Sequence, residues 1–147
     1  MSQNVEILYT AQTRTTGGRK NGVSRSSDGL LDIRLSMPGS ASIGANPEQL
    51  LAAGWSASLV RTVTLEACKN DIALPTGVGI DAEIDLCLAG GRSFLRARFN
   101  IGLPGAEQHI ARALVNQAFE SCSFSRATRG NMDIVIKLIQ DVKSRPG

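Results

Sequence analysis

Cysteine is the residue type in this chain best suited to redox chemistry, and three are present, at positions 68, 87 and 122. The number is odd and no two are spaced as C-x-x-C, so the pattern predicts neither a disulfide framework nor a zinc site. Cys68 and Cys87 fall within a helix pattern and a strand pattern, where a small buried hydrophobe is the ordinary role of cysteine. We therefore expect both to pack in the core.

Two short patterns resemble sites of other enzyme classes. The segment GWSAS, which ends at Ser58, resembles the nucleophile elbow of hydrolases, but its last residue is not glycine and it lies within a helix pattern. The segment TGGR, which ends at Arg19, lacks the GK[ST] ending of a phosphate loop, and no helix is predicted after it. The single histidine, His109, has no metal-ligand spacing, and we expect it on the surface. A serine hydrolase is therefore a disfavoured hypothesis.

The elements that must position these residues alternate between strand and helix. Asn46, Pro47 and Gln49 form a helix-start pattern, and the apolar run after them predicts a long buried central helix. Gly90-Gly91 predicts a hairpin. The predicted order is strands over 5–15, 23–27 and 30–35, a helix over 47–69, strands over 79–88 and 93–103, a helix over 106–121 and a strand over 132–139, before a frayed tail after 141. This order predicts a single α+β domain over 1–147, with antiparallel sheets packed on the central helix.

Composition excludes several other classes. Of the 147 residues 42% are hydrophobic and 20% charged, which is an ordinary globular balance. The net charge of +3 is spread along the chain and only 4% of residues are aromatic, so a nucleic-acid surface is not predicted. No secretory signal is visible, and no apolar run approaches the roughly 20 residues that span a bilayer. We expect a cytoplasmic protein without a membrane or metal site.

Five segments, taken in order, resemble the Ohr branch of the Ohr/OsmC family of thiol peroxidases. They are LYTA at 8–11, TGGR at 16–19, SSDGLLDIRLS at 26–36, NPEQLLAAGWSAS at 46–58 and CSFSRATRGNMDI at 122–134. The resemblance implies an intertwined homodimer of OsmC-like fold, with two active sites at the subunit interface, that reduces organic hydroperoxides. In that reaction a thiolate becomes a sulfenic acid and a second cysteine condenses with it to a disulfide. No bound cofactor is implied; a dithiol such as protein-bound dihydrolipoamide is the reductant.

By the same resemblance, the attacking cysteine falls at Ser58 and the resolving cysteine at Cys122. The activating guanidinium falls at Arg19 and the carboxylate that orients it at Glu48. A serine hydroxyl is barely ionised at neutral pH and forms no disulfide, so we expect this chain to be inactive or nearly so. Cys68 cannot replace the missing thiol, because ten residues of helix span about 15 Å and a disulfide needs Cα atoms within about 7 Å.

Glu48 poses the same geometric problem, since it also lies ten residues from Ser58 on the predicted helix. Either the helix bends, for example near Gly54, or the Arg19–Glu48 pair comes from the second subunit. We favour the second subunit. Without the resemblance, Glu48 would be read as a carboxylate at a helix N-terminus and Arg19 as a solvated turn residue.

The chain departs from the family pattern at two further places. After Cys122 it reads Ser-Phe-Ser-Arg where the family usually has Pro-Tyr-Ser-Asn, and the loop before Asn46 is shorter. Two explanations of the serine at position 58 stay open beside the disfavoured hydrolase. One is a peroxidase whose cysteine was replaced by substitution, and the other is a natural relative that binds a hydrophobic or peroxide-like ligand, or a partner.

Overall fold

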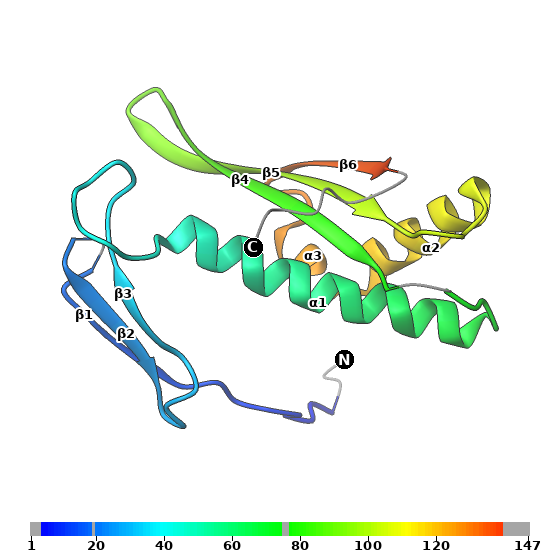
Figure 1. Ribbon diagram of the computed structural model, residues 1–147, viewed down its shortest axis with the longest axis horizontal. Helices are drawn as coiled ribbons and strands as arrows, with labels where there is room; N and C mark the ends of the chain where they lie inside the picture. The colour runs from blue at the N-terminus through cyan, green and yellow to red at the C-terminus, as the bar shows by residue number, and fades with distance from the viewer. Residues whose placement is uncertain (1–3, 19, 75–76, 140–147) are drawn as a thin grey trace. The chain divides into compact units, whose positions relative to one another are not determined.

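The computed structural model describes residues 4–18, 20–74 and 77–139 (Figure 1). The chain divides into two compact units, Met1–Pro47 and Glu48–Gly147, and each is described by itself. A single domain over the whole chain therefore stays a prediction. The frayed tail predicted after 141 lies outside the described residues.

The first unit is a three-stranded antiparallel sheet in the order β1-β2-β3, as the predicted meander required. Its strands are β1 (Thr13–Thr16), β2 (Gly22–Ser26) and β3 (Asp32–Leu35). The first strand is shorter than predicted, because residues 5–12 pair with no strand of this sheet. The apolar side chains of that segment are left exposed, among them Val5, Ile7, Leu8 and Tyr9.

The turn between β1 and β2 depends on its glycines. Gly17 and Gly18 have φ of 78° and 59°, in the left-handed region that other residues rarely adopt. A Cβ on Gly22 would lie 2.1 Å from the carbonyl oxygen of Gly18, so no side chain fits there. The predicted turn is confirmed. Arg19, within it, lies outside the described residues.

The second unit contains α1 (Pro47–Lys69), β4 (Gly79–Ala89), β5 (Arg92–Gly102), α2 (Gln108–Ser121), α3 (Ser123–Thr128) and β6 (Asp133–Ile139). The long helix and the β4–β5 hairpin are confirmed. Gly90 and Gly91 both have positive φ, as a two-residue type I′ turn requires. The short helix α3 was not predicted.

The sheet of this unit has the order β4-β5-β6, and one pairing differs from the antiparallel prediction. β4 pairs with β5 antiparallel, but β6 pairs with β5 in parallel. A parallel neighbour needs a long crossover, which α2 and α3 supply. Alternation of apolar residues in β6 does not distinguish the two directions, so the antiparallel prediction was wrong for this one pair.

The core lies between the sheet and the helices of the second unit (Figure 1). α1 contributes a stripe at four-residue spacing, formed by Trp55, Leu59, Val63 and Ala67. The Phe99 ring of β5 packs edge-on against Trp55, with ring centroids 4.7 Å apart. The side of α1 that bears Ala53, Gly54 and Ala57 is exposed, so the helix is not buried all round as predicted.

Two core predictions were wrong. Cys68 is exposed, because Ala67 takes the inward position of α1 and the next residue turns away from the core. Cys87 is half-buried and stands opposite Phe94, on the face of the β4–β5 hairpin away from the core residues of those strands. In the described part of the chain, no helix has the length and apolar character needed to cross a membrane.

Candidate functional site

Ser58 and Cys122 meet within the second unit although 64 residues separate them. Ser58 is half-buried at the middle of α1, and Cys122 lies between α2 and α3 with 1% of its surface exposed. The Oγ of Ser58 is 3.6 Å from the Sγ of Cys122, which is hydrogen-bond distance for sulfur. The structure therefore brings together the two positions that the family resemblance assigned to the attacking and resolving cysteines.

The backbone of Cys122 is fixed by the helices on both sides. Its N–H donates to the carbonyl of Ala118 at 2.8 Å, which closes α2. Its carbonyl accepts the N–H of Arg126 at 2.9 Å, which opens α3. Cys122 itself is extended, with φ of −66° and ψ of 127°. The thiol is therefore presented from a sharp, hydrogen-bonded junction rather than from a loose loop.

A second hydrogen bond, besides the Ser58–Cys122 contact, joins α1 to α3. The indole Nε1–H of Trp55 donates to the Oγ of Ser125 at 3.0 Å, and 0% and 2% of these two residues are exposed. Trp55 precedes Ser58 by three residues on α1, and Ser125 of α3 follows Cys122 by three. Neither residue was given a role from the sequence. No local pattern in the sequence pointed to a contact between them, because 70 residues separate the two.

Polar groups around Cys122 set its acidity. Burial of the thiol raises its pKa, but the backbone N–H and hydroxyl of Ser125, the hydroxyl of Ser58 and the N–H of Phe124 together lower the pKa below its ordinary value. Among the described residues, the groups that shift this pKa include no charged side chain. Neutral hydrogen-bond donors are therefore what favour the thiolate here.

An aromatic ring lies beside the hydroxyl–thiol pair. Phe124 is 40% exposed, and a Cβ added to Gly54 would lie 3.9 Å from its Cζ atom. Gly54 is four residues before Ser58 and so faces the same side of α1. A methyl group at position 54 would therefore make ordinary van der Waals contact with the ring. The site thus has one apolar border, formed by an aromatic side chain that solvent reaches.

Glu48 is not brought to Ser58 along α1. It lies half-buried in the first turn, and the helix continues through Gly54 without interruption, so ten residues span about 15 Å. The alternative of a helix bend near Gly54 gains no support, because α1 is continuous from Pro47 to Lys69. Arg19, outside the described residues, cannot be related to either.

The features of a serine hydrolase are not assembled. Ser58 lies in mid-helix rather than at a strand-to-helix turn. His109 is on the surface, as predicted, with its Nδ1 3.2 Å from a carboxylate oxygen of Glu107. Within the described ranges, no group of three or more His, Cys, Asp or Glu side chains is arranged to hold a metal ion.

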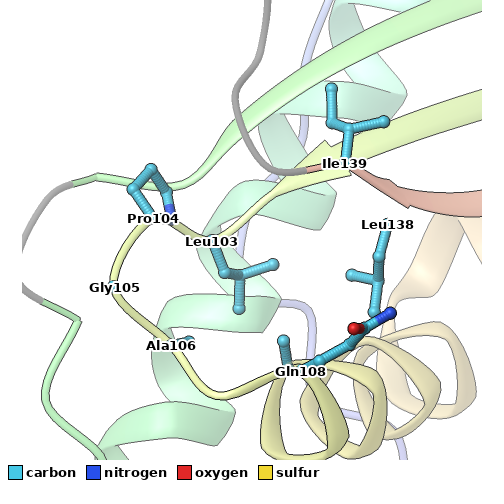
Figure 2. Close-up of a pocket in the computed structure, with 8 residues that line it drawn as sticks. Leu103, Pro104, Gly105, Ala106, Gln108, Leu138 and Ile139 are labelled. Atoms are coloured by element: carbon cyan, nitrogen blue, oxygen red, sulfur yellow. The ribbon is translucent and has the colours of Figure 1, made fainter.

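A pocket elsewhere in the second unit is lined by residues that could not act as nucleophile, acid or base. Figure 2 shows this pocket of about 390 Å³, where β5 and β6 end and α2 begins. It is lined by Leu103, Pro104, Gly105, Ala106, Gln108, Ala111, Leu138 and Ile139. None of these side chains titrates, and neither Ser58 nor Cys122 is among them.

Comparison with known proteins places this geometry in a family. A family model described as OsmC-like protein matches residues 39–137. The organic hydroperoxide resistance protein of Xanthomonas axonopodis pv. citri is 36% identical over 142 residues, which cover 94% of this chain and 99% of that protein. The chain belongs to the OsmC-like family.

Solved structures agree with the assignment to the OsmC-like family. The organic hydroperoxide resistance protein OhrB of Bacillus subtilis is 33% identical, with a TM-score of 0.84, over 90% of this chain and all of that one. A protein from Legionella pneumophila described as an organic hydroperoxide resistance protein OsmC is 35% identical, with a TM-score of 0.85, over 90% of this chain and 98% of that one. The predicted α+β fold of OsmC-like type is thus confirmed.

Proposed function

We propose that this OsmC-like chain carries the site of a thiol-dependent organic hydroperoxide reductase, in which Ser58 stands at the position of the attacking cysteine. The observation that carries the proposal is the 3.6 Å separation of the Ser58 Oγ and the Cys122 Sγ. Relatives named organic hydroperoxide resistance proteins, similar over nearly the whole chain, support the substrate class.

A cysteine at position 58 would give the site two sulfurs close enough to bond. Its thiolate attacks the outer oxygen of a hydroperoxide, so that an S–O bond forms, the O–O bond breaks and the alkoxide leaves as an alcohol after taking a proton. The Cys122 thiolate then attacks that sulfur. An S–S bond forms, the S–O bond breaks and hydroxide leaves as water. A dithiol returns both cysteines to thiols by exchange.

The chain with Ser58 stops before the first of these steps. A hydroxyl is almost un-ionised at neutral pH and is a poor nucleophile toward peroxide oxygen. Cys122 retains its hydrogen-bonded setting but faces an oxygen that cannot become a sulfenic acid. The dependence on a dithiol reductant points to a reducing compartment, so we place the protein in the cytoplasm.

A homodimer completes the proposed site. Both units expose apolar side chains that a second copy would cover, among them Ile7, Leu8 and Tyr9 in the first unit and Leu86, Leu88 and Phe94 in the second. The second copy would also supply Arg19 and Glu48, because Glu48 of the same chain lies about 15 Å along α1 from Ser58.

The test is steady-state consumption of tert-butyl or cumene hydroperoxide with dihydrolipoamide, comparing the chain as it stands with Ser58→Cys. Activity only in the cysteine form supports the proposal. Inactivity of a folded Ser58→Cys chain overturns it. A matched variant, Ser56→Cys, places a thiol two residues away on α1 and should stay inactive.

A second function is favoured by one observation, the exposed Phe124 ring beside Gly54. With a non-nucleophilic serine next to it, this apolar border suits the binding of an alkyl chain without chemistry. Titration of the unsubstituted chain with an alkyl alcohol or hydroperoxide, followed by fluorescence of its single tryptophan, would detect such binding. An unchanged spectrum would remove this alternative.

A further inference from the structure

The charged side chains of the sheet in the first unit all lie on one of its two faces. Arg14 of β1 stands directly opposite Arg25 of β2, and Arg25 stands opposite Asp32 of β3, so the three point to the same side. Arg34 follows Asp32 by two residues on β3 and therefore shares that side. The three strands contain no other charged residue. Three guanidiniums and one carboxylate thus gather on this face, although basic residues are scattered along the sequence.

The pairing of two arginines on this face is unfavourable by itself. Side chains directly opposite each other have Cβ atoms about 4.5–5.5 Å apart, and like charges in such a pair repel. Arg14 and Arg25 form such a pair. Asp32 offsets part of the repulsion, because its Oδ1 accepts a hydrogen bond from the Nε of Arg25 at 2.9 Å. In the described part of the chain, no carboxylate is paired with Arg14 or Arg34, so positive charge remains on this face.

A cavity of about 420 Å³ opens beside Arg34 within the same unit. Its lining includes Asn21, Val23, Arg34, Ser42 and Ile43. Val23 stands directly opposite Arg34, so the cavity borders the charged face of the sheet. Among the described residues that line it, Arg34 is the only one that titrates. A ligand in this cavity would therefore meet a guanidinium and no carboxylate.

Asn21 adds a neutral hydrogen-bond donor to the cavity. The Ser42 hydroxyl donates to the Oδ1 of Asn21 at 3.2 Å, so this bond occupies the amide oxygen. The two hydrogens on Nδ2 take no part in it and can donate to an anion. The backbone of Asn21 has φ of 57°, in the left-handed region that asparagine adopts more readily than most residues. The turn thus places an amide donor at the edge of the cavity.

The segment that bounds the other side of the cavity is held against β3. The N–H of Ala45 donates to the carbonyl of Arg34 at 2.8 Å, and the N–H of Ser36 donates to the carbonyl of Ala45 at 2.9 Å. Gly44 approaches β3 so closely that a Cβ there would lie 2.8 Å from the carbonyl oxygen of Arg34. Hydrogen-bonded backbone therefore bounds the cavity next to Arg34.

We propose that this cavity binds a small soluble molecule through its phosphate group, held by the guanidinium of Arg34 and the amide of Asn21. Arg25 is the diagonal neighbour of Arg34, about 7–8 Å away, so both guanidiniums can reach one phosphate. Guanidinium groups pair bidentately with phosphate oxygens. A phosphate monoester carries a charge of about −1.5 to −2 near neutral pH, which balances three arginines set against one aspartate. Ile43, 88% exposed, flanks the rest of the ligand.

The first experiment is calorimetric titration of the unsubstituted chain with phenyl phosphate at constant ionic strength. We expect saturable binding. Benzoate, which carries the same ring and a single negative charge, should bind about tenfold more weakly or less, as expected for the loss of a hydrogen bond between charged groups. Absence of saturable phenyl phosphate binding, or equal affinity for benzoate, would overturn the inference.

Two substitutions that change charge in opposite directions test the residues assigned here. Arg34→Gln should weaken phenyl phosphate binding about tenfold. Asp32→Asn should strengthen it, because it removes a negative charge and frees the Nε of Arg25, and misfolding cannot produce a gain in affinity. Arg92→Gln is the matched control, since it removes the same charge from an exposed position at the start of β5 in the second unit. Equal weakening in Arg34→Gln and Arg92→Gln, or no gain in Asp32→Asn, would contradict the proposal.

Sedimentation with vesicles separates a soluble ligand from a membrane surface. The chain should not sediment with phosphatidylcholine vesicles that contain phosphatidic acid more than with phosphatidylcholine alone. Sedimentation with phosphatidic acid in a chain that does not bind phenyl phosphate would replace the cavity by a membrane-binding face and refute the inference. None of these measurements depends on peroxide chemistry, so an inert Ser58→Cys chain would leave them unaffected.

Discussion

Cys122 and Cys68 lie in contrasting parts of the same unit. Cys122 is buried at the α2–α3 junction, with backbone hydrogen bonds on both sides and the hydroxyl of Ser58 at 3.6 Å. Cys68 is exposed near the end of α1, beside Lys69, whose Nζ lies 3.7 Å from a Glu66 carboxylate oxygen. The first is surrounded by hydrogen-bond donors, and the second is exposed to solvent next to a charged side chain.

The contrast shows that surroundings, rather than residue type, decide which cysteine is suited to chemistry. Closeness to a reacting position, hydrogen bonds that favour the thiolate and a fixed backbone occur together at Cys122. Cys68 shares a helix with Ser58 but is ten residues away, about 15 Å along the axis. For reaction with position 58, the contact that Cys122 makes from the α2–α3 junction therefore matters more than a shared helix.

The largest expected effect comes from removing each cysteine in the Ser58→Cys background. Cys122→Ala should abolish the disulfide and leave a sulfenic acid at position 58, whereas Cys68→Ala should change turnover less than about twofold, as for a surface position away from the site. Dimedone labelling with mass spectrometry measures the first result, and peroxide consumption measures the second. A disulfide that joins the introduced thiol at position 58 to Cys68 would contradict the assignment of Cys122 as the resolving cysteine.

Subunit mixing tests whether Glu48 acts from the partner. The double variant Ser58→Cys/Glu48→Gln should be nearly inactive, because each thiol faces a glutamine of its partner. Mixing it with the unsubstituted chain should restore about half of the Ser58→Cys activity per thiol-bearing heterodimer formed by random exchange. Failure to restore any activity, with exchange verified by native mass spectrometry, would place Glu48 in the same chain as the thiol.

Substitutions on the buried face of α1 should lower the free energy of unfolding more than substitutions on its exposed face. Trp55→Ala removes a wholly buried ring and its hydrogen bond to Ser125, so the free energy of unfolding should fall by about 3–5 kcal/mol. Leu65→Ala, at a position 48% exposed on the same helix, should cost less than about 1 kcal/mol. Urea unfolding measures both. Equal losses would mean that the core does not lie where the structure places it.

The smallest effect is a dependence of stability on pH. The pKa of Cys122 is lower in the folded chain than its ordinary value, so the folded state releases the proton more readily. The resulting stabilisation is complete above the unfolded thiol pKa of about 8.5 and is lost as pH falls through the folded value. The free energy of unfolding of the chain relative to Cys122→Ala should therefore rise with pH in this window. A difference that falls with rising pH would contradict the hydrogen-bonded thiolate.

The sequence was sufficient for the elements whose signals are local. The start of α1 at Pro47 and the Gly90-Gly91 hairpin follow from capping and turn chemistry. The parallel direction of β6 and the helix α3 did not follow, because both depend on contacts between distant segments. Cys68 was misplaced because a mostly apolar helix gives little indication of which side faces the core.

The contacts of the candidate site likewise depend on segments that are distant in the sequence. The pairing of Ser58 with Cys122 was reached through a resemblance to a family, since no spacing along the chain predicts a contact over 64 residues. The contact between Trp55 and Ser125 was not predicted, because it depends on how α3 packs against α1.

Whether position 58 is the site of the attacking thiol is best decided by hydroperoxide reduction by Ser58→Cys beside the unsubstituted chain, each at equal concentration with dihydrolipoamide. We expect dithiol-dependent turnover in the cysteine form that exceeds that of the serine form by at least about 10³-fold, as for loss of a nucleophile in other enzymes, together with a disulfide between positions 58 and 122. A folded Ser58→Cys chain that neither reduces hydroperoxide nor forms that disulfide would contradict it.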